Sequence, residues 1–133
     1  MKRLIATWLA AATTAAMLTP STQALTAKNV FESSDLALLF CTYVRNNDTL
    51  RLQHKLRDLR MRLRDVYPQV RCNGASLIQF AMQNNSNDIG AFIARSVNPS
   101  DIQEMGDMEW AEQRDMLQST IGQTLQQRLN LKQ

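Results

Sequence analysis

The hydrophobic and polar positions of this 133-residue chain follow helical rather than strand spacing. Residues 36–44 are almost wholly apolar, which predicts a buried helix. Residues 49–66 carry apolar side chains at alternating spacings of four and three, which keeps them on one stripe of a helix. At 100° per residue these positions fall within about 80° of one another. They are Leu52, Leu56, Leu59, Leu63 and Val66.

Five helices account for most of the apolar positions. Asn98-Pro99 is the clearest boundary, and Ser100 with Gln103 forms a capping-box pattern that starts the last helix. Gly106 is a point at which this last helix can be interrupted. The sequence contains no alternating run long enough for a strand. We therefore predict an all-α fold, a small bundle of about five helices over residues 36–44, 49–66, 76–83, 88–96 and 100–129.

The first 24 residues have the three-part layout of a secretory signal peptide. Lys2 and Arg3 precede an apolar, alanine-rich run of about 15 residues, shorter than the roughly 20 that a bilayer-spanning helix needs. An uncleaved anchor is therefore the weaker interpretation. We expect cleavage near Ala24 and a periplasmic or secreted protein. Its predicted parts are a signal peptide (1–24), a helical domain stapled by one disulfide (25–97) and an acidic C-terminal helical segment (98–133).

The predicted staple joins Cys41 and Cys72, the only two cysteines of the chain. Export would favour their pairing, and the closed loop of about 32 residues would stabilise the fold by roughly 3.7 kcal/mol in the chain-entropy model. A zinc site needs about four ligands, whereas the chain offers these two cysteines and His54. A catalytic cysteine needs an activating base, and the predicted helix turns His54 away from its apolar stripe. Free thiols, redox chemistry and metal binding stay as weaker alternatives.

Asn73-Gly74 follows the second cysteine and predicts a turn, because both residues tolerate left-handed backbone angles. The turn would lead into the helix that begins near Ser76. A β-hairpin is the alternative, but it needs alternating strands on both sides, which this part of the sequence lacks.

Charge is distributed unevenly along the chain. Without residues 1–24 the chain has 13 basic and 12 acidic side chains, yet residues 45–71 hold eight basic and three acidic ones, and residues 101–115 hold six acidic and one basic. In one interpretation the two segments face each other, within the fold or between two copies. In the other, the helix over 49–66 lies on phospholipid or lipopolysaccharide phosphates, because basic residues beside an apolar stripe are typical of helices on a membrane surface. The candidate anion-binding residues are Arg51, Lys55, Arg57, Arg60, Arg62 and Arg64.

The sequence contains no GxSxG, HExxH, P-loop or glycine-rich nucleotide signature. No set of residues marks a metal or cofactor site, and nucleic acid is not expected as a partner. We therefore expect a binding or structural accessory protein rather than an enzyme. Its partner would be an unidentified protein, a second copy or an anionic membrane surface. Tryptophan and methionines in the acidic segment belong either to the edge of the core or to a docking face.

Several of these elements recur in a known order. Cys41 in an apolar helix is followed by a basic amphipathic helix, by Cys72-Asn73-Gly74 and by Leu77-Ile78-Gln79-Phe80-Ala81. This order resembles a family of small exported proteins from marine and related gammaproteobacteria that carry a domain of unknown function. The resemblance covers roughly residues 31–97 and leaves out the acidic segment. It implies envelope localisation and pairing of the two cysteines, and it brings no activity, ligand or catalytic residue.

Overall fold

The computed structural model describes residues 35–130, so the predicted signal peptide and its cleavage near Ala24 lie outside the described residues. The regular secondary structure of this part is entirely helical, which confirms the all-α class. Eight α-helices are present between residues 35 and 130, more than the five predicted, because two of the predicted helices are broken. The elements are α2 (Asp35–Arg45), α3 (Thr49–Asp58), α4 (Leu63–Val66), the 3-10 helix η1 (Tyr67–Gln69), α5 (Leu77–Gln83), α6 (Asn87–Ser96), α7 (Pro99–Glu104), α8 (Asp107–Gln113) and α9 (Thr120–Asn130).

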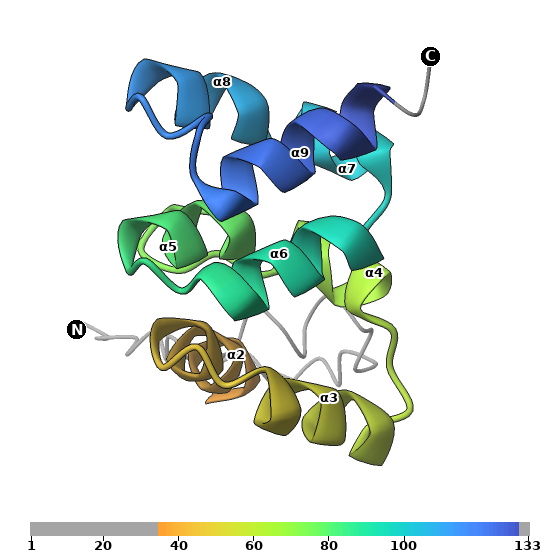
Figure 1. Cartoon of the computed structure of the whole chain (residues 1–133). Helices are drawn as coiled ribbons and strands as arrows, with labels where there is room; N and C mark the ends of the chain where they lie inside the picture. The colour runs from red at the N-terminus through yellow and green to blue at the C-terminus, as the bar shows by residue number, and fades with distance from the viewer. Residues whose placement is uncertain (1–34, 131–133) are drawn as a thin grey trace, which may run out of the picture.

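The helices stack in three layers (Figure 1). The first layer holds α2 and α3, the middle layer holds α5 and α6 with α4 beside them, and the last layer holds α7, α8 and α9. The middle layer packs against both others, since α2 contacts α5 and α6 contacts α9. All three layers contribute to one hydrophobic core, including Phe40, Ile78, Ile93, Ile102 and Leu125. Residues on both sides of position 97 therefore share this core.

The predicted helix over 49–66 is wrong as a continuous element. Arg60 has a φ of 53°, in the left-handed region, and this conformation ends α3. The N–H of Arg60 donates to the carbonyl of Arg57 at 3.0 Å, and the N–H of Met61 donates to that of Leu56 at 2.9 Å. These two hydrogen bonds are those of a Schellman cap, which satisfies the last carbonyls of a helix.

The apolar stripe of this segment is nevertheless used by the core. Leu52, Leu56, Leu63 and Val66 are buried, because α4 brings the last two back to the core after the break. Leu59, which the sequence placed on the same stripe, lies at the break and is 38% exposed. The apolar residues therefore keep their spacing of four and three across the break, so the sequence pattern did not indicate that the helix is interrupted.

The predicted helix over 100–129 is also divided. Gly106, with a φ of 70°, separates α7 from α8, which confirms the predicted interruption. A second break over residues 114–119 was not predicted. It ends at Ser119, whose Oγ accepts a hydrogen bond from the N–H of Gly122 at 3.0 Å. Gly122 lets this turn lie close to α9, because a Cβ there would be 2.2 Å from the carbonyl oxygen of Met116.

In the middle layer, α5 and α6 agree closely with the helices predicted over residues 76–83 and 88–96. Ser76 caps α5, because its Oγ accepts from the N–H of Gln79 at 3.0 Å and the Gln79 side chain accepts from the N–H of Ser76 at 3.3 Å. The predicted turn at Asn73-Gly74 is confirmed. It also has hairpin pairing, since Cys72 and Ala75 exchange backbone hydrogen bonds of 2.8 and 3.0 Å, but the pairing stops after this single bridge.

Within residues 35–130, none of the helices combines the length and apolar character that a membrane-spanning segment requires.

Candidate functional site

A disulfide joins the first two layers. Cys41 of α2 and Cys72, in the segment before α5, are bonded with their Cα atoms 5.7 Å apart. The structure thereby confirms the predicted pairing, and the described residues hold no free cysteine. Both residues are buried, with exposures of 6% and 3%. The bond is therefore a staple inside the core rather than an accessible redox centre.

A buried carboxylate, which the sequence analysis did not single out, joins the middle layer to the last. Asp107 is the first residue of α8 and is fully buried. Its Oδ1 accepts hydrogen bonds from Ser76 Oγ at 2.7 Å and from Gln79 Nε2 at 3.0 Å, and its Oδ2 accepts one from the Tyr67 hydroxyl. Donors from η1 and from the start of α5 therefore meet on one residue of α8. We call these four residues the Asp107 cluster.

The surroundings of Asp107 push its pKa in two directions. Burial removes the carboxyl group from water and raises its pKa above the ordinary value, while hydrogen bonds from Tyr67, Ser76 and Gln79 and the charge of Arg71 lower it. Burial has the larger effect. Burial and the neighbouring carboxylate also raise the pKa of the Tyr67 phenol, which keeps it protonated as a donor. All four cluster residues are buried, so the cluster holds elements together and offers no open face to a substrate.

Sequence reasoning missed Asp107 because it counted the residue among six acidic residues of a solvated segment. Two features could have indicated that Asp107 is buried. Gly106 breaks the helix directly before it, and Ala111 follows one turn later on the same face and is also buried.

The six predicted anion-binding residues do not form one face. Three of them lie on α3. Arg51 pairs with Asp48 at 3.3 Å, the guanidinium of Arg57 is 3.1 Å from Nδ1 of His54, and Lys55 is half-buried. These side chains have local partners or limited exposure, which leaves them less available to a ligand.

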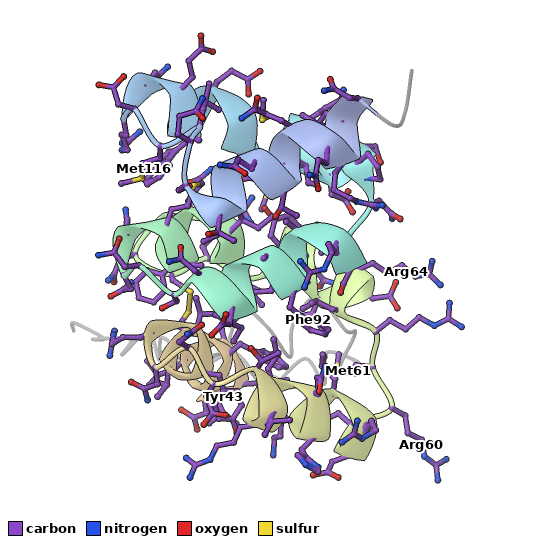
Figure 2. All side chains as sticks on the ribbon, viewed as in Figure 1. Tyr43, Arg60, Met61, Arg64, Phe92 and Met116 are labelled. Atoms are coloured by element: carbon purple, nitrogen blue, oxygen red, sulfur yellow. A yellow bond between two sulfur atoms is a disulfide. The ribbon has the colours of Figure 1, made fainter. Side chains whose placement is uncertain are left out.

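The other three surround the break between α3 and α4. Arg60, Arg62 and Arg64 are exposed, and none of them has a hydrogen-bonded or ion-pair side-chain partner among the described residues. Figure 2 shows Arg60 and Arg64 pointing away from the body of the molecule on the same side. We call these three residues the basic corner.

The backbone conformation of Arg60 is unusual in this chain. Five non-glycine residues within 35–130 have a positive φ, and the other four are Asn47, Asn73, Asn85 and Asp115. Asparagine and aspartate are common there because their short polar side chains bond locally. Arginine has no such advantage, and a non-glycine residue in this region costs on the order of 1 kcal/mol. The fold therefore carries strain at the residue that presents the basic corner.

The basic and acidic segments contact each other where the Tyr67 hydroxyl bonds Asp107 and where the guanidinium of Arg71 lies 3.0 Å from the sulfur of Met105, so the expected contact within the fold is present there. The exposed charges of α3 and α8 do not take part in it. Figure 1 places α3 and α8 in the two outer layers, with α5 and α6 between them. We call the exposed carboxylates of Glu109, Glu112 and Asp115 the acidic end. A hollow of about 270 Å³ adjoins it and is lined by Glu112, Asp115, Leu117 and Gln118. The second form of that interpretation, contact between two copies, stays open.

Across residues 35–130, His, Cys, Asp and Glu form no group of three or more that is arranged to hold a metal ion.

Comparison with known proteins adds one match. Residues 40–104 match the model of a family described as protein of unknown function (DUF3718). This segment is a DUF3718 domain. The predicted membership of a family of unknown function is thereby confirmed, over residues 40–104 rather than 31–97. No match was found among curated proteins or among solved structures.

The DUF3718 segment contains the disulfide, the basic corner and three members of the Asp107 cluster. It ends before Asp107 itself. The cluster thus ties the DUF3718 segment to the helices that follow it.

Proposed function

We propose that this protein is an exported binding or structural accessory protein of the cell envelope, acting by binding rather than catalysis, and that its basic corner binds anionic lipid or lipopolysaccharide. The layout of residues 1–24 supports export. The Cys41–Cys72 bond supports an oxidising compartment, because disulfides persist mainly outside the cytosol.

The observation that carries the proposal is the unpaired charge of Arg60, Arg62 and Arg64. Three exposed guanidinium groups without side-chain partners project from the break between α3 and α4, and Arg60 adopts a conformation that asparagine or glycine would adopt more easily. Guanidinium groups are suited to phosphate because their fork of N–H donors bonds two phosphate oxygens at once. An unusual backbone conformation at a non-glycine residue is also typical of functional positions.

The mode of binding differs from a helix lying flat on a membrane. That mode would need the apolar stripe of residues 49–66, which the core already buries. Binding by the basic corner is instead mainly electrostatic, with half-exposed Leu59 as the adjoining apolar side chain. It should therefore weaken sharply as salt screens the charges.

The test is co-sedimentation with vesicles of phosphatidylglycerol and of phosphatidylcholine at low salt. The variant is Arg60→Asn, Arg62→Ser and Arg64→Gln. Asparagine suits the left-handed position, and serine suits the first position before α4, so the variant should fold. Each basic residue near an anionic surface contributes about 1 kcal/mol, so the triple variant should bind phosphatidylglycerol about 100-fold more weakly.

The matched control is Arg51→Gln, Arg57→Gln and Arg95→Gln, which removes the same charge from exposed positions outside the basic corner. This control should keep most of the binding. An equal loss in the control would show that net charge alone matters, and a wild-type protein that ignores phosphatidylglycerol vesicles at low salt would remove the proposal.

A further inference from the structure

The two charged surfaces of the molecule lie far apart. The basic corner surrounds the α3–α4 break at one end, whereas the acidic end lies on and after α8 in the opposite layer (Figure 1). Figure 2 shows the same separation, with Arg60 at the lower right and Met116, just after α8, at the upper left. The two surfaces therefore cannot neutralise each other within one chain.

We infer that a second copy of this chain docks its basic corner on the acidic end of the first. The two surfaces have opposite net charge, because the acidic end holds three exposed carboxylates against one cation, Arg114, which stacks on the ring of Trp110 at 3.9 Å. Complementary charges guide and orient association between proteins. The charges of the chain without residues 1–24 explain why a copy suits this role. It has 13 basic and 12 acidic side chains, and residues 45–71 hold eight of the basic ones whereas residues 101–115 hold six of the acidic ones. Two copies therefore do not repel each other as strongly charged molecules of one sign would.

The receiving surface has a shape and chemistry that fit an arginine side chain. The hollow beside the acidic end places the carboxylates of Glu112 and Asp115 next to the apolar side chain of Leu117. An arginine lays its aliphatic stem on apolar surface while its guanidinium bonds carboxylates. Arg60 is the candidate to enter, because it projects from a turn rather than lying along a helix.

The contact joins two different surfaces, so it is heterologous. Such a contact repeats from copy to copy in an open chain unless the rotation between copies closes a ring. The inference needs both the basic corner and the acidic end, whereas the proposed function needs only the basic corner. A molecule held on an anionic surface by its corner would still offer its acidic end to the next copy.

The test is sedimentation velocity of the purified protein over a range of concentrations. At about 20 mM NaCl the weight-average mass should rise above that of the monomer as concentration increases, and at about 0.5 M NaCl it should return to the monomer, because salt screens exposed charges. A protein that stays monomeric at low salt overturns the inference. So does association that persists unchanged at high salt.

Two charge variants locate the contact. The corner variant is Arg60→Asp, Arg62→Asp and Arg64→Glu, in which aspartate suits both the left-handed position and the N-cap of α4, and glutamate suits its first turn. The end variant is Glu112→Lys with Asp115→Asn, in which lysine lies in the last turn of α8 and asparagine keeps a tolerated left-handed position.

Each variant alone should be monomeric. An equimolar mixture should form a complex, because it contains one intact corner and one intact end on different chains. If two copies instead joined corner to corner or end to end, only the variant that alters that surface would be monomeric, and the other variant would still self-associate. Association of either variant alone, or a mixture that stays monomeric, overturns the inference.

Vesicle binding separates this inference from the proposed function. The end variant keeps the basic corner and should still bind phosphatidylglycerol vesicles. Wild-type protein that binds vesicles but does not self-associate would support the proposed function and overturn the inference. Wild-type protein that self-associates but does not bind vesicles would support the inference and overturn the proposed function.

Discussion

Replacement of Asp107 by alanine should strongly destabilise the fold, because it removes an acceptor that three buried donors share. Gln79 would keep a second acceptor, the carbonyl of Met105 at 3.1 Å. The hydroxyl groups of Tyr67 and Ser76 would lose theirs. A buried donor without a partner costs about 1–3 kcal/mol, so the free energy of unfolding should fall by about 2–6 kcal/mol. This loss is a large part of the roughly 5–15 kcal/mol that stabilises a typical domain.

The assay is urea denaturation followed by far-UV circular dichroism, on Asp107→Ala, Tyr67→Phe and the double variant. Tyr67→Phe should cost less, about 1–3 kcal/mol, because the carboxylate keeps two other donors. The double variant should cost less than the sum of the two, with a coupling of about 0.5–3 kcal/mol. Additive effects, or a loss below about 1 kcal/mol for Asp107→Ala, would refute the reasoning.

The same carboxylate should give the stability of the fold a characteristic pH dependence. Because the pKa of Asp107 is raised in the folded state, its contribution is fully present below the unfolded value of about 3.9 and is lost as pH rises through the folded-state pKa. Stability relative to Asp107→Asn, which cannot titrate, should therefore fall as pH rises from about 4. A relative stability that rises over this range would mean that the folded state lowers the pKa instead.

Three further predictions concern the staple, a close helix contact and the basic corner. Replacing Cys41 and Cys72 by alanine should cost about 3–4 kcal/mol in urea denaturation, since the bond closes a loop with a sequence separation of 31 residues; a loss below about 1 kcal/mol would show that the staple hardly restricts the unfolded chain. Gly90→Ala should cost about 1–3 kcal/mol, because its Cβ would lie 2.2 Å from Cδ1 of Ile121; adding Ile121→Val, which removes that atom, should recover part of the loss, and no recovery would contradict this contact. Arg60→Gly should raise the free energy of unfolding by about 0.5–1 kcal/mol while weakening vesicle binding; a destabilised variant would show that Arg60 makes a stabilising interaction.

Local signals predicted most of the helices and the interruption at Gly106, but not the breaks at Arg60 and over residues 114–119. The glycine at position 106 was visible in the sequence and acts as expected. The capping box expected at Ser100 is wrong as the start of the helix, because α7 begins at Pro99 with Asn98 as its N-cap. The break at Arg60 had no visible signal, because neither glycine, proline nor asparagine marks it. Burial of Leu63 and Val66 after the break kept the apolar spacing of an unbroken helix. Tertiary packing, rather than local preference, decided this segment.

The candidate functional site was likewise predicted only in part from the sequence. Pairing of Cys41 with Cys72 followed from their number and the predicted compartment, since two cysteines allow one pairing. The cluster around Asp107 could not be derived in this way, because its donors precede it by 28 to 40 positions. Charge patterns along the chain likewise identify acidic and basic segments without showing which of them meet.

The basic corner lies inside the covalent ring that Cys41 and Cys72 close. Its exposed arginines are natural targets for trypsin-like proteases. A single cut there would open the ring but leave the two pieces joined through the disulfide. The nicked protein would keep its mass under non-reducing conditions and separate into two fragments only on reduction. The molecule can thus expose these arginines to cleavage while the disulfide keeps both pieces together.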